Sequence, residues 1–336
     1  MVSARKWIYA KRAEGEIQES NFQTVTEELP ALQDGGKRTE FPGRNRILQP
    51  RCGPSGYMQL GVLPVGSPII GTTVAKVLQS NRAEFPVGVY VCARIGWCTH
   101  AILNPDKQKD NRPYIVPSLE GHSRALGLGA LGLSGNTAYF GFLEICKPRE
   151  GETVVVSGAA GAVGSLVGQI AKIKGCRVVG LAGTAEKVRW LKEIGFDEAI
   201  NYKEASVREQ LAAATPGGID CYFDNVGGEL TAMVRERMNL YGRISVCGTV
   251  SSYNREQPIL ISDPQRDFVS KQLRQEGFVV FRWLNRWMEG ITQMAEWIKQ
   301  GKLVARETIY EGFDAAPKSF ISMLKGDNVG KAVIKV

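Results

Sequence analysis

A glycine-rich loop follows a short apolar run near the middle of the chain. Residues 153–157 predict a buried parallel strand, and the loop 158–164 comes directly after it. Within this loop, Gly161 would let the backbone approach a pyrophosphate, and Gly164 would let the next helix pack closely on the strand. The first N–H groups of that helix are suited to binding phosphate. The loop therefore predicts a dinucleotide site, with Ala159 at the first glycine position of the usual pattern.

The end of the next predicted strand bears on which nicotinamide cofactor is bound. An NAD site usually has an Asp or Glu about 20 residues after the loop, bonded to the ribose 2′-hydroxyl. Here the strand 177–182 is followed by Gly183 and Thr184, without an acid at its tip, and Lys187 is close by. These features favour NADP(H). Glu186 is the objection, and Lys187 taken alone fits a solvated lysine equally well.

Strands and helices alternate from residue 152 onward, which predicts an α/β domain with a doubly wound parallel sheet. The expected strands are 153–157, 177–182, 220–224, 243–247 and 278–280, and the expected helices are 162–174, 186–194, 230–240 and 287–299. Short apolar runs between residues 60 and 103, separated by Gly and Pro, predict a small β-rich domain. The tail 331–336 predicts a strand that pairs back onto this N-terminal domain.

Composition limits the other classes of function. The 336 residues suggest two domains, and 43% hydrophobic with 23% charged residues is typical of a globular protein. The net charge of +8 is spread along the chain, so we expect no nucleic-acid partner. The sequence lacks the apolar segment of a signal peptide and any run long enough to span a membrane. Seven scattered cysteines indicate reduced thiols in a cytoplasmic protein.

The histidine count argues against a metal centre. Only His100 and His122 are present, whereas a catalytic zinc site needs three protein ligands. Cys98 and His100 are two residues apart in an expected strand, where alternate side chains share a face for structural reasons. We therefore expect no bound metal.

Several segments together resemble the medium-chain dehydrogenase/reductase superfamily and, within it, the prostaglandin reductase group. They are 158–164, Lys187, 201–203, 223–228 and 326–331, with further matches at 137–141, 247–248, 253–254 and 278–280. The resemblance covers the chain outside residues 34–56. It implies a GroES-like, β-rich catalytic domain of residues 1–124 with 307–336, and a Rossmann NADP-binding domain of residues 125–306.

The same resemblance implies a set of residues that contact NADP(H). They are Ala160, Gly161, Ala162, Val163, Gly164, Lys187, Tyr202, Asn225, Cys247, Gly248, Thr249, Val250, Ser251, Ser252, Tyr253, Phe278, Val279, Val280 and Asn328. Lys187 and Tyr202 would contact the adenosine phosphate end, with Lys187 bonded to the 2′-phosphate. For Asn225 and Asn328 the alternative is turn chemistry, because Asn beside Gly favours turns.

The resemblance also implies a reaction, the reduction of the α,β double bond of enones and enals such as 15-oxo-prostaglandins and lipid-derived alkenals. Oxidation of a leukotriene hydroxyl is a further implied activity. Tyr253 matches the family tyrosine that donates to the developing enolate. Tyr57 matches a second tyrosine near the substrate, although the Asp-Pro that precedes it in the family is absent here. The alternatives are a quinone oxidoreductase of the same superfamily and a non-catalytic NADPH-binding protein. A homodimer is expected from the resemblance.

Residues 34–56 depart from the family pattern. In place of a half-buried strand they contain three Pro, five Gly and five basic residues, without a period-2 pattern. We interpret this stretch as read out of frame, with a true insertion or an exon difference as the alternative. If the residues are correct as written, we expect the β-rich domain to be weakened at a sheet strand.

Overall fold

The computed structural model describes residues 2–30, 39–42, 47–49, 63–108, 112–252 and 260–336. The chain forms two compact units. The first, which we call the β-rich unit, comprises Met1–Gly132 with Glu307–Val336, and the second, the sheet unit, comprises Leu133–Arg306. Among the described residues there is no helix whose length and apolar character would allow it to span a membrane.

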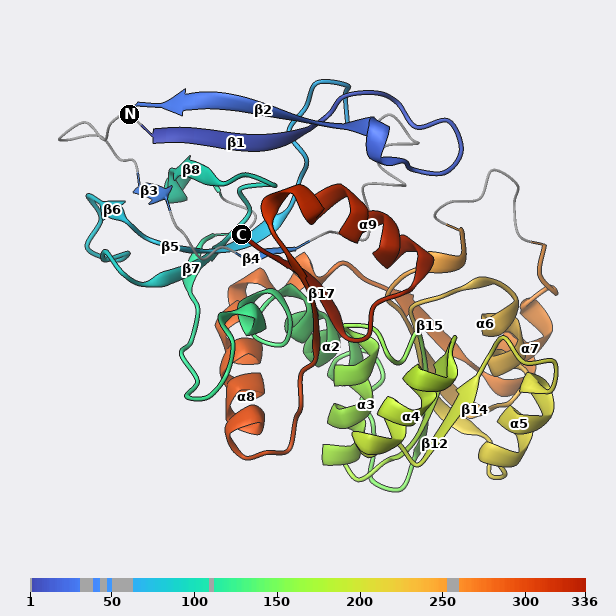
Figure 1. Cartoon of the computed structure of the whole chain (residues 1–336). Coiled ribbons are helices and arrows are strands. Elements are labelled where there is room, and N and C mark those ends of the chain that lie inside the picture. The colour runs from blue at the N-terminus through green and yellow to red at the C-terminus, as the bar shows by residue number, and fades with distance from the viewer. Residues whose placement is uncertain (1, 31–38, 43–46, 50–62, 109–111, 253–259) are drawn as a thin grey trace. The chain divides into compact units, whose positions relative to one another are not determined.

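The described residues of the β-rich unit form three sheets. Strands β1 (Val2–Tyr9) and β2 (Phe22–Leu29) form a long antiparallel ribbon, coloured blue in Figure 1. The largest sheet has the order β16 (Glu307–Glu311), β17 (Lys331–Lys335), β4 (Ile47–Gln49), β5 (Thr72–Lys76), β7 (Tyr90–Ala93) and β9 (Tyr114–Ile115). The third has the order β6 (Gln79–Ser80), β3 (Thr39–Pro42) and β8 (His100–Leu103). Helix α9 (Ala316–Lys325) and the short helices η1 (Glu19–Asn21), η2 (Pro105–Lys107), η3 (Arg124–Leu128) and η6 (Phe313–Ala315) complete the unit.

The C-terminal tail is a structural part of the β-rich unit. Strand β17 runs antiparallel to β4, with Ile334 opposite Leu48, which confirms the prediction that the tail pairs back onto this domain. Helix α9 reaches the core through Phe320, whose ring meets Trp97 edge to face with 5.8 Å between centroids. The C-terminal segment therefore contributes both a central strand and an aromatic anchor.

Two short strands, β3 and β4, lie within residues 34–56. Strands of four and three residues are too short to show a period-2 pattern. The interpretation that this stretch is read out of frame stays a prediction. Strand β3 pairs with both β6 and β8, and β4 pairs with β5 and β17. The remainder of this segment lies outside the described residues.

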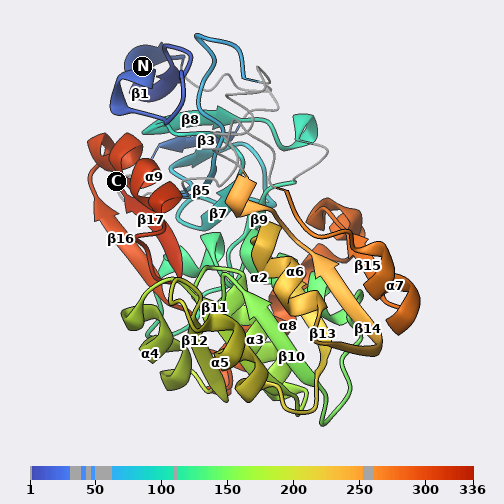
Figure 2. The same cartoon turned by 90° about the vertical axis from the view of Figure 1, so that its right-hand side faces the viewer.

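In the described part of the sheet unit, six parallel strands follow the order β12 (Glu198–Asn201), β11 (Arg177–Ala182), β10 (Thr153–Ser157), β13 (Ile219–Asp224), β14 (Met238–Val246) and β15 (Arg274–Gly277). This is the 3-2-1-4-5-6 order of a doubly wound dinucleotide-binding sheet. It confirms the doubly wound parallel sheet that the alternating pattern predicts. Figure 2 shows β10, β11 and β13 side by side at the centre, flanked by helices. The order reverses between β10 and β13, so their carboxyl ends form the switch point of the sheet.

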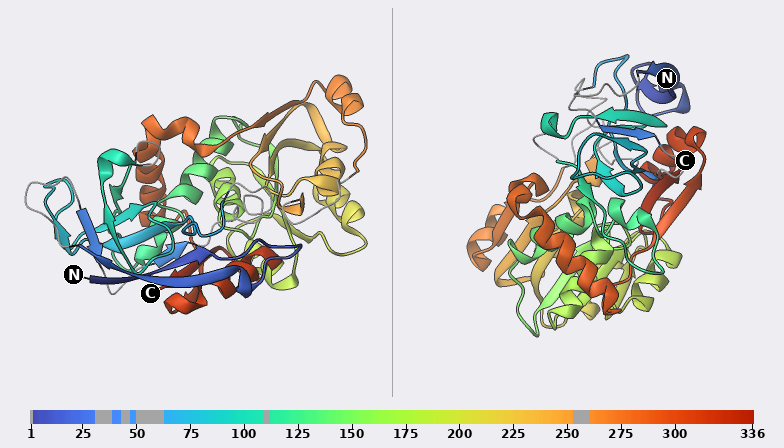
Figure 3. Two further views of the ribbon diagram at one scale, coloured as in Figure 1. Left: turned by 90° about the horizontal axis from the view of Figure 1, so that it is seen from above. Right: turned by 90° about the vertical axis from the view of Figure 1, so that its left-hand side faces the viewer.

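Helices cover the two faces of this sheet. They are α3 (Gly164–Ile173), α4 (Ala185–Glu193), α5 (Val207–Ala214), α6 (Gly228–Arg235) and α7 (Gln265–Lys271), with α2 (Leu133–Leu143) and α8 (Trp287–Lys299) added. Helices α8 and α2 pack against each other, and the left view of Figure 3 shows the orange α8 next to the green α2. On one face, Val155 and Tyr222 join a core with Leu211 of α5 and Leu230 of α6. Alternate strand residues thus serve opposite faces, as a parallel sheet covered on both sides requires.

Two expected elements of the sheet unit differ from the structure. The helix expected at 230–240 ends at Arg235, because β14 already begins at Met238. The strand expected at 278–280 is instead β15, four residues earlier, whose sequence is polar because it lies at the edge of the sheet. The apolar Phe278 misled that prediction because its ring packs against Gly141 of α2 rather than marking a strand.

A buried aromatic ring lies between helix α3 and strand β11. Phe196 is 3% exposed and packs against two glycines, Gly168 on α3 and Gly180 on β11. A Cβ at Gly168 would lie 1.9 Å from the end of this ring, and one at Gly180 would lie 2.8 Å from its side. The absence of a side chain at both positions therefore lets α3 approach the sheet with the ring between them.

We expect Gly168→Ala to destabilise the protein by about 1–3 kcal/mol, because the added methyl forces a well-packed ring to move. Gly217→Ala is the matched control, since a Cβ there would meet no atom within 4 Å. Denaturant unfolding measures both. A second substitution, Phe196→Leu, should recover part of the loss in the Gly168 variant, and equal stability of the two alanine variants would show that this contact does not constrain the helix.

Candidate functional site

The glycine loop (residues 158–164) turns sharply between β10 and α3. Gly158 has a φ of +58°, which favours glycine, and the Ala159 N–H donates to the Leu181 carbonyl of β11 at 3.0 Å. A Cβ at Gly164 would lie only 2.4 Å from the Gly158 carbonyl oxygen. Only glycine therefore allows α3 to begin this close to the end of β10, as the sequence predicts.

The N-terminus of α3 faces out of this turn. Its first bonds back along the chain include the Ser165 N–H to the Gly161 oxygen at 3.1 Å and the Val167 N–H to the Val163 oxygen at 3.0 Å. The Gly161 N–H donates to the Gly158 oxygen at 3.0 Å, whereas the amides of Ala162 to Gly164 have no acceptor within the helix. Such amides are the general property of helix starts that favours phosphate. A Cβ at Gly161 would lie 3.2 Å from the Gly158 oxygen, so the loop is also tight at that position. The residues present therefore fit a dinucleotide pyrophosphate.

The carboxylate of Asp224 organises the switch point beside the loop. It is buried, and its Oδ1 accepts hydrogen bonds from the Ser157 Oγ at 3.1 Å, from the Tyr222 hydroxyl at 2.9 Å and from two backbone N–H groups, those of Val226 at 3.0 Å and Gly227 at 2.9 Å. Its Oδ2 accepts from the Thr231 hydroxyl at 2.5 Å. Burial, with the nearby Asp224 charge, raises the pKa of Tyr222 well above its usual value, so this phenol stays a donor.

Asn225 joins the ends of the two central strands. Its Nδ2 donates to the Ser157 carbonyl at 2.7 Å, and its backbone N–H donates to the Ser157 Oγ at 3.0 Å. Its Cβ lies 3.3 Å from the position that a side chain on Gly158 would take. Asn225 is therefore a turn residue, as the alternative interpretation held, and it also lies directly beside the glycine loop.

Residues 247–252 are tied to the same turn. The N–H groups of Cys247 and Gly248 donate to the Asp224 carbonyl at 2.8 and 3.2 Å, and the Ser251 hydroxyl donates to the Val226 carbonyl at 2.6 Å. Val250–Ser252 form the short helix η4, with the Thr249 and Ser252 hydroxyls 2.8 Å apart. The predicted residues from Cys247 to Ser252 thus lie at one edge of the sheet with Asn225.

The predicted adenosine end lies at the tip of β11. Thr184 is the N-cap of α4 and accepts the Lys187 N–H at 3.3 Å, which places Lys187 in the first turn of the helix. A Cβ at Gly183 would lie 2.9 Å from the Tyr202 hydroxyl oxygen and 3.3 Å from the Lys203 Cε. Burial raises the pKa of Tyr202, so its hydroxyl is a hydrogen-bond donor at neutral pH. The structure therefore brings Lys187 and Tyr202 to the same strand end.

Glu186, the acid that argues against NADP, has a cationic partner. Its carboxylate lies 3.5 Å from a guanidinium nitrogen of Arg306, whose side chain also lies over the Trp190 ring at 5.7 Å. Both side chains of the ion pair are exposed, so the pair itself contributes little to stability. It nevertheless offsets the negative charge beside Lys187.

The remaining predicted cofactor residues fall in different environments. The Phe278 side chain is partly buried and packs against the core of Phe140 and Trp283, whereas Val280 is buried and Val279 is exposed. Val280 begins the short helix η5 (Val280–Arg286). Asn328 belongs to the β-rich unit, where its Nδ2 donates to the Gly330 carbonyl at 2.8 Å, the turn interaction expected of Asn beside Gly. The predicted catalytic residues Tyr253 and Tyr57 lie outside the described residues.

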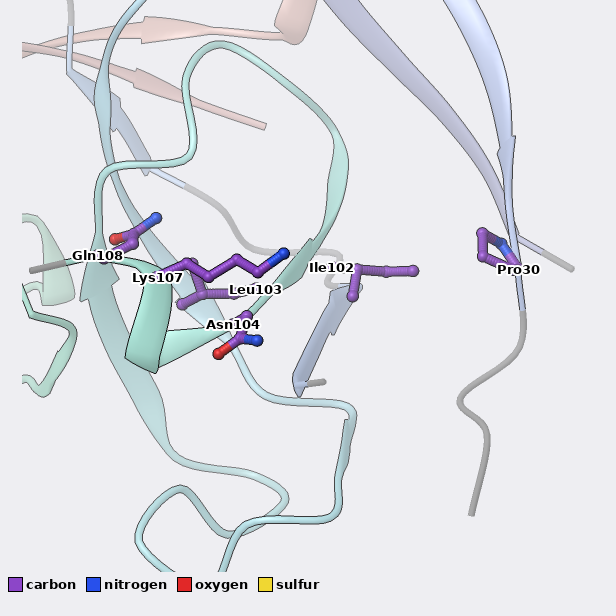
Figure 4. A pocket seen from close by; sticks show the side chains of 6 residues that line it. All are labelled: Pro30, Ile102, Leu103, Asn104, Lys107 and Gln108. Atoms are coloured by element: carbon purple, nitrogen blue, oxygen red, sulfur yellow. The ribbon is translucent and has the colours of Figure 1, made fainter. Parts of the chain in front are cut away.

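Within the described part of the chain, we find no group of three His, Cys, Asp or Glu side chains positioned to hold a metal ion. His100 lies 3.2 Å from the Thr99 hydroxyl, and His122 lies 2.9 Å from the Glu120 carbonyl. The β-rich unit has a hollow of about 530 Å³, shown in Figure 4. It is lined by Pro30, Ile102, Leu103, Asn104, Lys107 and Gln108, none of which is a predicted site residue.

The sheet order, the glycine loop and the switch point define a doubly wound dinucleotide-binding domain. Residues 162–299 match the family model described as zinc-binding dehydrogenase, and residues 5–110 match the one described as N-terminal domain of oxidoreductase. Prostaglandin reductase 1 of Bos taurus is 43% identical over 340 residues, covering 100% of both chains. The NADPH-dependent curcumin reductase of Escherichia coli is 36% identical, covering 99% of this chain and 96% of its own.

A solved structure gives the same result for the fold. CurA from Vibrio vulnificus in complex with NADPH has a TM-score of 0.89 to this structure and is 35% identical, covering 99% of each chain. The protein therefore belongs to the prostaglandin reductase family of the medium-chain dehydrogenase/reductase superfamily.

Sequence reasoning missed two features of the site. The first is the Asp224 network, for which the signal is an acid at the end of a central strand next to Asn225 and Gly227. The second is Lys203, which is part of a matched motif. Only the folded structure shows that its side chain lies close to Gly183. The bond from Ser157 to Asp224 spans 67 positions, and Lys203 approaches Gly183 from a neighbouring strand, so spacing alone cannot reveal these two contacts.

We expect Asp224→Ala to lower the free energy of unfolding by about 3 kcal/mol or more, because it leaves buried donors without an acceptor. Asp224→Asn retains one acceptor oxygen and should cost clearly less. Denaturant unfolding followed by circular dichroism measures both, with Asp314→Ala as a control at a side chain that is 71% exposed. If both Asp224 variants were as stable as this control, the carboxylate would not organise the switch point.

Proposed function

We propose that this protein is an NADPH-dependent reductase of the α,β carbon–carbon double bond of enones and enals. The observation that carries the proposal is the tip of β11, where Gly183 takes the place of an acid beside Lys187 and Tyr202. The relatives named as prostaglandin and curcumin reductases, and the NADPH-bound neighbour, support the same activity. The expected substrates are 15-oxo-prostaglandins and lipid-derived alkenals.

The preference for NADPH follows from charge at the adenosine end. An acid at the strand tip would bond a ribose 2′-hydroxyl and repel a 2′-phosphate. With glycine there, the Lys187 ammonium can make a charge-assisted hydrogen bond to the phosphate, and the Tyr202 hydroxyl can donate a second. Arg306 offsets the one nearby acid, Glu186.

When bound, NADPH supplies a hydride for the β-carbon of the enone. The residues of this chain have three tasks around it. The glycine loop from Ala160 to Gly164 offers backbone N–H groups to the pyrophosphate, and Asn225 with residues 247–252 shapes the wall at the switch point. We assign to Tyr253 the donation of a hydrogen bond to the substrate carbonyl oxygen, where negative charge develops. Tyr57 is proposed as a second substrate contact.

The proposal extends to the rest of the cofactor contacts and to the setting of the protein. The backbone of residues 278–280 and Asn328 are proposed to complete the cofactor site.

We propose that catalysis needs no zinc and that the partner is a small lipid-derived substrate rather than nucleic acid. We also propose that the protein is a cytoplasmic homodimer. Free thiols at the six described cysteines, five of them buried, support a reducing compartment. Light scattering of the purified protein tests the dimer.

The first test follows NADPH consumption at 340 nm with a medium-chain alkenal or a 15-oxo-prostaglandin. We expect turnover with NADPH, far weaker turnover with NADH, and no metal requirement after chelation. Lys187→Gln should raise the KM for NADPH about tenfold and leave the KM for NADH unchanged, because it removes a charge-assisted hydrogen bond to the 2′-phosphate.

The same assay discriminates the competing functions. Quinones replace enones as substrates in a parallel series, and faster quinone turnover would make this a quinone oxidoreductase. NADPH binding without turnover of either substrate class would indicate a non-catalytic binding protein. Equal KM values for NADPH and NADH in the wild type would contradict the cofactor assignment.

Tyr253→Phe tests the catalytic donor. The substitution keeps the ring and removes only the hydroxyl, so we expect kcat to fall about 100-fold while the KM for NADPH changes little. Tyr241→Phe is the control, at an exposed tyrosine of β14. An unchanged kcat in the Tyr253 variant would remove this residue from the mechanism.

A further inference from the structure

The side chain of Lys203 bends back over the tip of β11. Its Cε would lie 3.3 Å from a Cβ at Gly183, whereas the residue itself follows β12, the neighbouring strand. The Lys203 N–H donates to the Asn201 Oδ1 at 3.2 Å, and this local turn fixes the backbone from which the side chain extends. The ammonium group, one bond beyond Cε, is therefore close to Gly183.

Neighbouring contacts hold this arrangement. The Tyr202 N–H donates to the Ala182 carbonyl at 3.0 Å, so β12 and β11 remain paired up to the residue before Gly183. The Tyr202 hydroxyl and the Lys203 Cε lie on the same side of Gly183, the side to which a Cβ would point. A polar hydroxyl and a cationic side chain thus occupy the space that an acidic side chain fills in an NAD site.

The charge of Lys203 is not committed to a neighbouring carboxylate. In the described part of the chain its ammonium group has no ion pair, whereas Lys172 and Lys192 of the same unit are bonded to Asp197 and Glu198. The adjacent Glu204 accepts instead from the Gln210 amide at 3.1 Å. An exposed ammonium without an acidic partner is available to an anionic ligand.

We propose that Lys203 is a specificity-determining residue that binds the 2′-phosphate of NADPH together with Lys187. Lys187 approaches from the first turn of α4, and Lys203 approaches across Gly183 from the end of β12. Two lysine side chains from different elements would therefore contact the same 2′-phosphate, a dianion. The proposal rests on the proposed use of NADPH, and it adds a residue on which the preference for NADPH over NADH depends.

The test is direct binding of 2′,5′-ADP and of 5′-AMP, measured by isothermal titration calorimetry without substrate or turnover. These ligands share the adenosine 5′-phosphate and differ in the 2′-phosphate. For Lys203→Gln we expect the Kd of 2′,5′-ADP to rise about fivefold, as fits one exposed charge-assisted contact. The Kd of 5′-AMP should be unchanged, and Lys203→Arg should retain most of the wild-type affinity for 2′,5′-ADP.

Lys174→Gln is the matched control, because it removes the same charge from an exposed lysine. Lys174 lies at the C-terminal end of α3, away from the glycine loop. If both variants lost the same affinity for 2′,5′-ADP, the effect would come from net charge alone, and the proposal would be overturned. Wild-type affinity for 2′,5′-ADP in the Lys203 variant would overturn it as well. If the wild type bound 2′,5′-ADP no more tightly than 5′-AMP, the proposed use of NADPH would itself be contradicted. Loss of enone turnover alone would leave the binding result valid, so the two failures can be distinguished.

Discussion

The buried carboxylate of Asp224 is the interaction on which the site geometry depends. It lies at the end of β13, where the sheet order reverses, and it accepts hydrogen bonds from the end of β10, from the start of the following turn and from α6. No cation is needed to hold it, because several well-directed donors solvate a buried carboxylate in place of water. The main-chain oxygen of the same residue fixes Cys247 and Gly248, so the loops after β13 and β14 share one anchor.

The Asp224 anchor can position the site only because the helices approach the sheet closely. Gly164 and Gly168 remove side chains from the face of α3 that meets β10, β11 and the Phe196 ring. On another part of the sheet, the Phe278 ring fills the space left by Gly141, and the Ser245 hydroxyl donates to the Gly141 carbonyl at 2.7 Å. Close packing below the carboxyl edge thus fixes the position of the first amides of α3, which we propose bind the cofactor phosphates.

Much of the sheet unit could be predicted from sequence because its signals are local. The apolar runs of β10 and β11 and the glycine loop each lie within a few residues. Other features depend on tertiary contacts that leave no local pattern. Strand β15 is polar because it lies at an edge, and the apolar Phe278 after it packs its ring against Gly141 of α2. Strands β3 and β4 are too short to show periodicity. The Asp224 network joins residues 67 positions apart and could not be read from spacing.

The adenosine end shows how charge and backbone choice combine. Glycine at position 183 does not by itself select a phosphate. It only leaves the strand end without an acidic side chain and leaves room there for a ligand group. Selection requires that positive charge enter that space and that nearby negative charge be offset. In the proposed arrangement, Lys187 of α4 and Lys203 at the end of β12 would meet the first condition. Arg306 meets the second, since its guanidinium pairs with Glu186 while lying over Trp190. Because these groups come from four separate segments, preference for NADPH is a property of the folded sheet edge rather than of any one motif.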